Sequence, residues 1–566
     1  MLMRRILGLT VVFVCSCVSE RADLSQKPAA PPPTPLSIPV PASPAPVEML
    51  RVAGDKIFDG SGKNVILRGI AFGNQVWTDS ADPRMHHSEV DYARVKDLGM
   101  NVVRFYMNHI TFEDAASPGQ LKPSGLAWLD DNIAWAKKQG VYLVLNLHVP
   151  PGGYQSSGKG TELWNNPKAQ DQFVALWKAL ADHYRAETTI AGFDLLNEPV
   201  VPKSIDQWKS LAERTIAAVR TVDPWHLMFV ERVNSVGLDW KENSEQNFFR
   251  VQDPNIVYEF HFYKPFNFTH QNAAWAEMAA ADAHYPDPNV ASIDWFNEQW
   301  ATGTFQSPRL PAGDSDWKFY QGAPFTVTNN DLVLGKPALA CVNNSGKAWF
   351  DDLTLEELDA KGIPKRTIWK TSLDSTRGWY YWTKDGSGAA SNEPKGHSDH
   401  ASVAISGSKS DANLGAEYLQ FRVQPTGVYR LSGWMKGQNI PARATCQIRL
   451  DFYSARAPVF PMDKSFLAYE LDAYVNWGKR QHVPLFLGEF GAIHQTFEGD
   501  RGGVRWVSDL LDLILERQLS FTYHDYHESS FGLYYGDNSL PDPANANQAL
   551  LDLFKSKLGA TSSAKF

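Results

Sequence analysis

The stretch Val141-Tyr-Leu-Val-Leu-Asn-Leu-His148 is an almost unbroken apolar run that ends on a polar residue. A short apolar run between helix-like segments predicts a strand that is buried on both faces. Such segments flank it at Leu126–Gln139 and Gln172–Arg185. Strands that alternate with helices in this way are typical of a parallel sheet covered by helices.

The same pattern recurs in both directions along the chain. The other strand-like segments are Val65–Ile70, Val102–Tyr106, Gly192–Pro199, His226–Glu231, Ile256–His261, Pro484–Glu489 and Leu519–His524. Together with 141–148 they make eight, and helical patterns lie between several of them. The fold class predicted is therefore α/β, a (β/α)8 TIM barrel.

Between the sixth and seventh strands the composition changes. Residues 302–461 are rich in Thr, Ser, Gly and Asn, and segments such as Val428–Met435 alternate in a period of two. This pattern predicts an inserted antiparallel β-sandwich, because barrel loops tolerate insertions. The barrel is then divided between residues 48–301, with strands one to six, and residues 462–566, with strands seven and eight.

The N-terminal residues carry processing signals. Arg4 and Arg5 precede a short apolar run, and Cys17 stands where a bacterial lipobox has its lipidated residue, so residues 1–17 predict a lipoprotein signal peptide. An ordinary secretory signal is the alternative. Residues 18–47 are rich in proline and predict a semi-rigid tether. We expect a cell-envelope protein anchored to a membrane by its lipid (the outer membrane if Gram-negative), or otherwise a secreted one.

The amino-acid composition limits the kinds of molecule that this protein is expected to bind. The 566 residues include 54 basic and 63 acidic ones, and the net charge of −9 argues against nucleic acid. There are 19 Trp residues, which suit either sugar stacking or a large core. Cys341 and Cys446 lie in strand-like segments and either pair or remain free thiols. We expect a monomer without a cofactor or metal.

Polar residues gather at or near the C-terminal ends of the predicted strands. In a (β/α)8 barrel these ends meet on one face, where the chemistry of the fold is located. One polar residue at a strand end would be unremarkable, but six together indicate a site. They are Arg104, His148, Asn197, Glu198, His261 and Glu489.

Two of these residues are glutamates, Glu198 in Asn-Glu-Pro and Glu489 in Gly-Glu-Phe. Retaining hydrolysis of a glycosidic bond needs two carboxyl groups about 5–5.5 Å apart, one as acid/base and one as nucleophile. The nucleophile must stay ionised, so it needs positive charge and hydrogen-bond donors nearby. Arg104 and Tyr263 are candidates for that role.

With these residues the sequence resembles glycoside hydrolase family 5, over about 52–558 without the insertion. The resemblance implies that Glu198 is the acid/base, Glu489 the nucleophile, and Asn197 the partner of the sugar 2-hydroxyl. It also implies substrate-binding roles for Arg104, His148, His261 and Tyr263.

The eighth strand departs from the family pattern, which ends in a Trp at the floor of the −1 subsite. Here His524 or Tyr526 takes that place, and we count His524 among the substrate-binding residues. The residues His524, Asp525, His527 and Glu528 also suggest a metal site. We do not predict one, because residues 524 and 527 of a strand point to opposite faces.

Other aromatic residues have two interpretations. Trp77 and Trp164 are in loops expected at the rim of the cleft, and we assign them to substrate binding, with loop packing as the alternative. The pair His86–His87 is expected in a solvated loop.

The insertion resembles the jelly rolls of carbohydrate-binding modules in Gly346–Leu355 and Val428–Gly437. Because the order of these segments is reversed, we expect a circularly permuted jelly roll whose strands join in connected sheets. Its aromatic residues form either a sugar-binding platform or a core. They are Trp379, Tyr381, Trp382 and Trp434.

The resemblance implies a retaining glycosidase acting on a β-linked glucan polysaccharide or oligosaccharide, with endo-β-1,4-glucanase favoured. A β-mannanase and a β-1,3-glucan hydrolase are the alternatives within the family. A surface glycan-binding protein without catalysis is the alternative from another class, and the presence of both Glu198 and Glu489 argues against it.

Overall fold

The structure is a computed structural model that describes residues 49–559. Residues 79–85, 114–115, 159, 238–246, 277, 279–280, 293–297, 399–400 and 538 within that range are not described. The predicted signal peptide with Cys17 and the predicted tether lie outside the described residues, so the lipid anchor stays a prediction. Within the described part of the chain, every helix is too short or too polar to cross a membrane.

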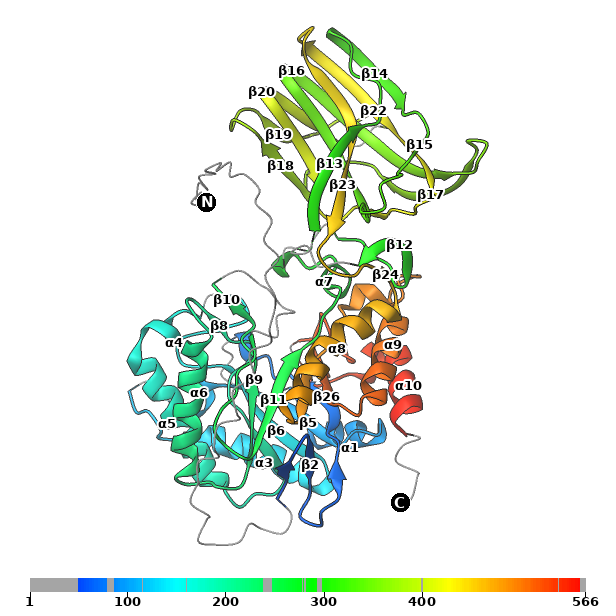
Figure 1. Ribbon diagram of the computed structural model, residues 1–566. Coiled ribbons are helices and arrows are strands. Elements are labelled where there is room, and N and C mark those ends of the chain that lie inside the picture. The colour runs from blue at the N-terminus through cyan, green and yellow to red at the C-terminus, as the bar shows by residue number, and fades with distance from the viewer. Residues whose placement is uncertain are drawn as a thin grey trace, which may run out of the picture. The chain divides into compact units, whose positions relative to one another are not determined.

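Eight parallel strands close into a barrel, and their order around it is their order in the chain (Figure 1). All eight strands expected from the sequence are present, which confirms the predicted fold class. They are β4 (Arg68–Phe72), β5 (Val102–Asn108), β6 (Tyr142–Val149), β7 (Ile190–Asp194), β9 (Leu227–Glu231), β11 (Ile256–His261), β25 (Leu485–Glu489) and β26 (Ser520–Tyr523).

Long helices cover the outside of the barrel (Figure 1). Tryptophans on three of them are fully buried, and each indole N–H donates to a backbone carbonyl: Trp177 to Leu195, Trp208 to Glu231 and Trp506 to Lys264. Much of the tryptophan content is therefore core. The helices are α1 (Glu89–Asp97), α3 (Pro123–Gln139), α5 (Pro167–Tyr184), α6 (Asp206–Arg220), α8 (Lys464–Gln481), α9 (Gly503–Glu516) and α10 (Gln548–Phe554).

Apolar residues fill the lower end of the barrel. A small antiparallel sheet of β1 (Arg51–Ala53), β2 (Lys56–Phe58) and β3 (Asn64–Val65) supplies Ile57 to a cluster with Val102 of the barrel. This cluster contains only apolar side chains. At the other end of the barrel, where the strands finish, Asp194, Glu231 and Glu489 are the last residues of their strands.

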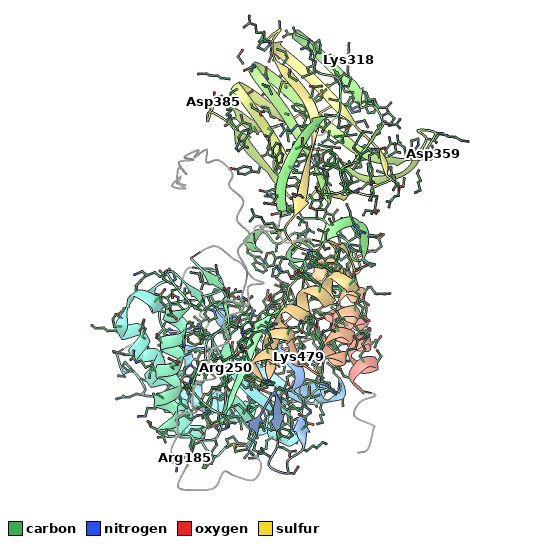
Figure 2. The ribbon with its side chains drawn as sticks, in the orientation of Figure 1. Arg185, Arg250, Lys318, Asp359, Asp385 and Lys479 are labelled. Carbon is green, nitrogen blue, oxygen red and sulfur yellow. A yellow bond between two sulfur atoms is a disulfide. The ribbon has the colours of Figure 1, made fainter. Side chains whose placement is uncertain are left out.

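The insertion forms a β-sandwich whose strands belong to one hydrogen-bonded network of 11. Figure 2 shows charged residues such as Lys318, Asp359 and Asp385 at its periphery. The strands are β13 (Glu298–Phe305), β14 (Gly313–Gln321), β15 (Phe325–Thr326), β16 (Leu334–Leu358), β17 (Pro364–Thr371), β18 (Trp379–Thr383), β19 (Ala389–Glu393), β20 (Ser402–Ala416), β21 (Phe421–Arg422), β22 (Val428–Ile440) and β23 (Thr445–Ala455).

The long strand β16 joins the sandwich together, since it pairs with strands from both halves of the insertion. The sheets are therefore connected, although the jelly-roll identity stays a prediction. The first sandwich strand begins at Glu298, ahead of the predicted boundary at 302. Between barrel and sandwich, the chain leaves through β12 (Asp287–Ser292) and returns through β24 (Phe460–Met462), which pair antiparallel.

The two cysteines of the insertion, whose pairing the sequence left open, are bonded. Cys341 and Cys446 face each other on β16 and β23, with Cα atoms 4.2 Å apart, and form a disulfide in the sandwich core.

The histidine pair before α1 is buried. His86 and His87 are each only 4% exposed, and the ring of His87 stacks on Phe72 at 3.9 Å. The prediction of a solvated loop for this pair is wrong, because aromatic packing covers it.

Candidate active site

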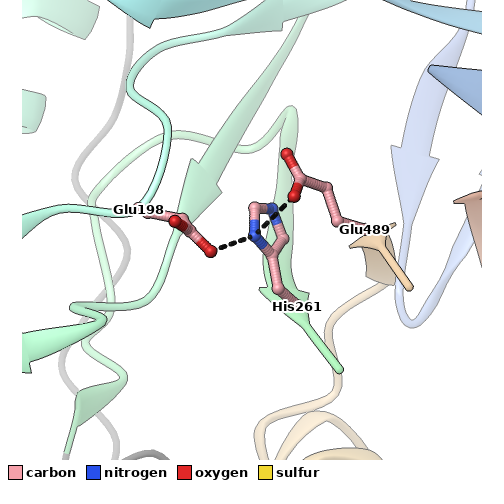
Figure 3. Close-up of side chains that lie close together, drawn as sticks. All are labelled: Glu198, His261 and Glu489. Atoms are coloured by element: carbon pink, nitrogen blue, oxygen red, sulfur yellow. Dashed lines mark hydrogen bonds and ion pairs between the residues drawn. The ribbon is translucent and has the colours of Figure 1, made fainter. Parts of the chain in front are cut away.

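The polar residues predicted at the strand ends come together at one end of the barrel. Glu198 follows β7, His261 ends β11 and Glu489 ends β25. Figure 3 shows the His261 ring between the two glutamates, with its Nδ1 3.0 Å from Glu198 Oε1 and 3.5 Å from Glu489 Oε2. One carboxylate oxygen of Glu198 and one of Glu489 lie within 4.8 Å of each other.

Glu489 accepts hydrogen bonds on both carboxylate oxygens. Arg104 Nη1 and the Tyr106 hydroxyl donate to Oε1 at 2.6 Å each, and the Tyr263 hydroxyl donates to Oε2 at 2.9 Å. Burial alone would raise the pKa of Glu489, but the positive charges around it, with His261 foremost, hold that pKa well below its usual range. Glu489 is therefore ionised at neutral pH, as a nucleophile requires.

Glu198 differs from Glu489 in its surroundings. Its side chain is 17% exposed, compared with 6% for Glu489. Its backbone is in the left-handed region at φ 43°, which costs a residue other than glycine about 1–3 kcal/mol. Its N–H donates to Glu231 Oε2 at 2.6 Å, and this bond helps to hold the conformation. Glu198 is thus the more accessible carboxyl group, as proton exchange with solvent requires.

A fully buried Arg104 binds Glu489 and also Asn197, the residue before Glu198. Its Nε donates to Asp194 Oδ2 at 2.8 Å and lies 3.1 Å from Glu259 Oε1. Its Nη2 donates to Asn197 Oδ1 at 3.0 Å, so the amide nitrogen of Asn197 points away from the arginine. Because all three guanidinium nitrogens are bound, Arg104 is rigid and holds Glu489 and Asn197 in fixed positions.

His261 is surrounded by four carboxyl groups. Besides Glu198 and Glu489, its Nε2 lies 3.6 Å from Glu231 Oε2 and 3.5 Å from Glu259 Oε1. Burial lowers the pKa of His261, but these charges outweigh it and raise that pKa well above the usual value. A positive His261 between Glu198 and Glu489 reduces the repulsion between two carboxylates that must lie close together.

His148 lies on the opposite wall as a neutral ring. It stacks on Tyr106 at 4.1 Å, and its Nδ1 is 3.0 Å from Asn146 Oδ1. Burial holds the pKa of His148 well below its usual range. A neutral imidazole at this position offers hydrogen bonds to a ligand without adding charge.

Of the two alternatives for the end of the eighth strand, His524 is the one at the site. Its Nδ1 is 3.0 Å from the Tyr106 hydroxyl, and its Nε2 is 3.4 Å from Glu528 Oε2. Tyr526 is fully buried, and its hydroxyl donates to Asp91 instead.

The structure separates the two loop tryptophans. Trp77, in a short 3-10 helix (Val76–Thr78), is half-buried, and its ring centre is 6.3 Å from that of His148. Trp164 is 6% exposed, and its indole N–H donates to Gln155 Oε1 at 2.8 Å. Trp77 therefore borders the site, whereas Trp164 packs in the core, as the alternative of loop packing describes.

Sequence reasoning did not identify Tyr106, although a signal was present. Residues two apart in a strand face the same side, so Tyr106 points where Arg104 points. The same alternation marks Glu259, two residues before His261. A charged or hydroxyl-bearing residue inside an otherwise apolar strand is the sequence signal that points to Tyr106 and Glu259.

Three groups of His, Asp and Glu among the described residues have potential ligand atoms close enough for a metal ion. His261 pairs with the glutamates of two groups and His524 pairs with Glu528 in the third, and we assign no metal to them. His527, which the sequence placed near one of these groups, directs its ring nitrogens to the carbonyls of Tyr534 and Ser539 at 2.9 and 2.7 Å. The groups are Glu198, His261 and Glu489; Glu231, Glu259 and His261; and His524, Asp525 and Glu528.

Parts of this chain are similar to known proteins. Residues 58–307 match the family model described as cellulase (glycosyl hydrolase family 5). Endoglucanase C of Acetivibrio thermocellus is 34% identical over 194 residues, which cover 34% of this chain and 55% of that protein. A beta-xylosidase of Phanerodontia chrysosporium is 33% identical over 257 residues, covering 39% of this chain and 52% of that protein.

The chain thus spans about half the length of these two curated relatives. Among solved structures, endoglucanase Cel5A of Thermotoga maritima aligns with a TM-score of 0.46 at 17% identity, over 86% of this chain and 96% of that one. The matched segment 58–307 contains barrel strands β4 to β11, together with Arg104, His148, Asn197, Glu198, His261 and Tyr263. Residues 58–307, which include six of the eight barrel strands, are thus similar to the cellulase family of glycosyl hydrolases, family 5.

Proposed function

We propose that this protein is a retaining glycoside hydrolase that cleaves O-glycosidic bonds by double displacement. The distance between the two glutamates carries the proposal. Carboxylate oxygens of Glu198 and Glu489 lie within 4.8 Å of each other. Retaining enzymes hold these groups about 5–5.5 Å apart, whereas inverting enzymes leave about 6.5–9.5 Å for a water molecule.

The surroundings of the two residues assign their roles. Glu489, ionised and held by Arg104, Tyr106 and Tyr263, attacks the anomeric carbon while Glu198 gives its proton to the departing oxygen. The glycosidic C–O bond breaks, and an ester bond forms between the sugar and Glu489. Glu198, now ionised, then takes a proton from water as that water attacks the same carbon, which releases the sugar and restores both carboxyl groups.

For the substrate we propose a β-linked glucan, cut internally at β-1,4 bonds. Support comes from the resemblance of the barrel to endoglucanase C. The alternatives are a β-mannan and a β-1,3-glucan, and a protein of Emericella nidulans named probable glucan 1,3-beta-glucosidase A is also 34% identical over 147 residues, which cover 24% of this chain and 35% of that protein.

A panel of soluble β-glucans and mannan tests the choice. We expect carboxymethyl cellulose and mixed-linkage β-glucan to yield oligosaccharides of several lengths, and mannan and laminarin to yield at least about tenfold less reducing sugar. Product length is measured by chromatography. Glucose alone as the first product, or preference for mannan or laminarin, would contradict the proposed substrate. No release from any β-glycan would favour the glycan-binding protein instead.

The sandwich offers a candidate sugar-binding surface on β18. Tyr380 and Trp382 are two residues apart, so they share one face, and they are 62% and 42% exposed. Trp379 and Tyr381 face the other way and pack against the sandwich core. Trp434 also takes no part in this surface, because its ring stacks on His397. We propose that Tyr380 and Trp382 stack on sugar rings of the polysaccharide.

Replacing Trp382 by alanine is expected to weaken retention on insoluble cellulose by about fivefold or more, since stacking of one aromatic ring contributes about 1–2 kcal/mol. Hydrolysis of a short soluble oligosaccharide should not change. Depletion from the supernatant by cellulose measures the binding, with exposed Trp300→Ala as the matched control. Equal retention of the Trp382 and Trp300 variants and the wild type would exclude this surface.

A further inference from the structure

The nucleophile has a second hydroxyl donor whose proton has two alternative destinations. The Tyr106 hydroxyl lies 2.6 Å from Glu489 Oε1 and 3.0 Å from His524 Nδ1. A hydroxyl carries one proton and donates one hydrogen bond, although it accepts others. Tyr106 therefore donates either to Glu489 or to His524, and a His524 that donates to Tyr106 leaves Glu489 as the acceptor.

The far side of His524 is held by a carboxylate. His524 Nε2 is 3.4 Å from Glu528 Oε2, and the two side chains are 13% and 12% exposed. An imidazolium has an N–H on both nitrogens and matches both contacts, one to Glu528 and one to Tyr106. The hydrogen bonds then run in one direction, from His524 through Tyr106 to Glu489.

We propose that His524 is a positioning residue for the nucleophile, because the N–H of its Nδ1 commits the Tyr106 proton to Glu489. The inference rests on the hydrolytic function proposed above. If His524 loses the Nδ1 proton and keeps the one that faces Glu528, Nδ1 becomes an acceptor. Tyr106 is then free to donate to His524, and Glu489 loses one of its three donors. An indole N–H also donates but never titrates, so histidine makes the direction of this bond depend on pH.

The charges that face His524 favour the protonated ring. Burial lowers its pKa, but Glu489 and Glu528 on either side, with Asp525 next to it, raise the pKa to about 9. Asp525 itself has a pKa raised by burial to about 8, so it is mostly neutral at pH 7 and adds negative charge only in alkaline solution.

Four other titratable groups among the described residues near His524 carry no charge at neutral pH. Burial lowers the pKa of His148 well below its usual value and that of His270 to about 3. Burial also raises the pKa values of Tyr106 and Tyr263 well above their usual range, so both remain phenols. The protonation of His524 therefore follows chiefly from the carboxylates.

The test is the pH profile of kcat/KM on an aryl β-cellobioside with a dinitrophenolate leaving group. Such a leaving group departs without a proton from Glu198, so the alkaline limb of the profile does not report the acid catalyst. For the wild type we expect activity to fall through an apparent pKa of about 9, that of His524.

Three variants distinguish a role of His524 in the hydrogen bonds to Tyr106 and Glu489 from a role in packing alone. Glu528→Gln keeps an acceptor but removes a charge, so the alkaline limb should move to lower pH by about one unit or more. His524→Asn keeps an N–H donor that does not titrate, so the limb should disappear while kcat/KM at pH 7 stays within about tenfold of the wild type. Tyr106→Phe should lose about 10- to 100-fold at pH 7, because a bond to a charged group is lost.

Glu498→Gln is the matched control. Glu498 also pairs with a histidine four residues away in sequence, His494 at 3.7 Å, but on the surface and away from Glu489. Its profile should coincide with that of the wild type. An alkaline limb that is the same in the wild type, Glu528→Gln and His524→Asn would overturn the proposal, even though hydrolysis by the wild type would uphold the proposed function.

Nitrogen-15 NMR of histidine-labelled protein tests the proposal without turnover. His524→Asn identifies the signals of His524, whose two ring nitrogens should both be protonated at pH 7 and titrate near pH 9. A neutral His524 ring at pH 7 would overturn the proposal. An imidazolium in a protein that hydrolyses no substrate would support the hydrogen-bond direction and locate the failure in the proposed function.

Discussion

Replacing Glu489 by glutamine is expected to lower hydrolysis of a β-glucan by about 10⁴-fold or more, because no other group replaces a missing nucleophile. The substitution preserves the size of the side chain but removes the charge that Arg104, Tyr106 and Tyr263 surround. Binding of the polysaccharide should persist. Reducing-sugar release measures the first effect and affinity electrophoresis in a glucan gel the second.

A smaller variant shows that the loss is chemical. In Glu489→Ala the space left by the carboxylate admits azide, which can attack the anomeric carbon of an aryl β-cellobioside directly. One displacement then occurs instead of two, so the product should be the α-glycosyl azide, identified by NMR. Glu498→Gln, on the surface, serves again as the unaffected control. If Glu489→Ala or Glu489→Gln kept full activity on β-glucan, Glu489 would not be the nucleophile.

Replacing Glu198 by alanine should have an effect that depends on the leaving group. For a β-glucan, whose departing sugar oxygen needs a proton, we expect a loss of about 10²- to 10⁴-fold. For a dinitrophenyl cellobioside the first step should change little, while the second step slows because water loses its base. The sugar–enzyme ester then accumulates, and KM should fall together with kcat.

Steady-state kinetics on both substrates, with and without azide, check this expectation. Azide needs no base and should speed turnover of the aryl substrate by Glu198→Ala, giving the β-glycosyl azide. The two glutamate variants should thus produce azides of opposite configuration. An equal loss on both substrates, with no response to azide, would argue against Glu198 as the acid/base.

The barrel could be read from the sequence because its strands are buried on both faces. A strand such as Tyr142–Val149 must then be almost wholly apolar, and its polar residues stand out where it ends. For this reason the sequence alone predicts Glu198, His261 and Glu489 as site residues. Parallel strands alone bring these residues together, although they lie far apart in the chain.

What the sequence could not supply were the contacts between strands. Tyr106 binds Glu489 across 383 residues, and Asp194 binds Arg104 across 90, and neither spacing forms a local motif. The orientation of Trp164 could not be predicted either, since a loop tryptophan can turn outward to a ligand or inward, as here to Gln155. Which of the two orientations the side chain adopts depends on its packing against residues that are distant in sequence.

In the sandwich, the sequence predicts a strand but does not predict which of its faces is exposed. The alternation in Trp379–Thr383 indicates a strand, but a period of two does not say which face is outside. The structure places Tyr380 and Trp382 outside, so only one member of the expected aromatic platform, Trp382, is exposed. The face of a strand is set by its partners, here β20, which the sequence alone did not identify.

Glu489 is expected to form a covalent bond to the sugar. Incubation of the wild-type protein with a dinitrophenyl 2-deoxy-2-fluoro-β-cellobioside measures this directly, because fluorine slows both displacements while the activated leaving group speeds the first, so the sugar–enzyme ester accumulates. Peptide mass spectrometry should find one fluorocellobiosyl group, attached to Glu489. A sugar attached to another residue, or turnover of substrate with inversion at the anomeric carbon and no labelled peptide, would contradict the account.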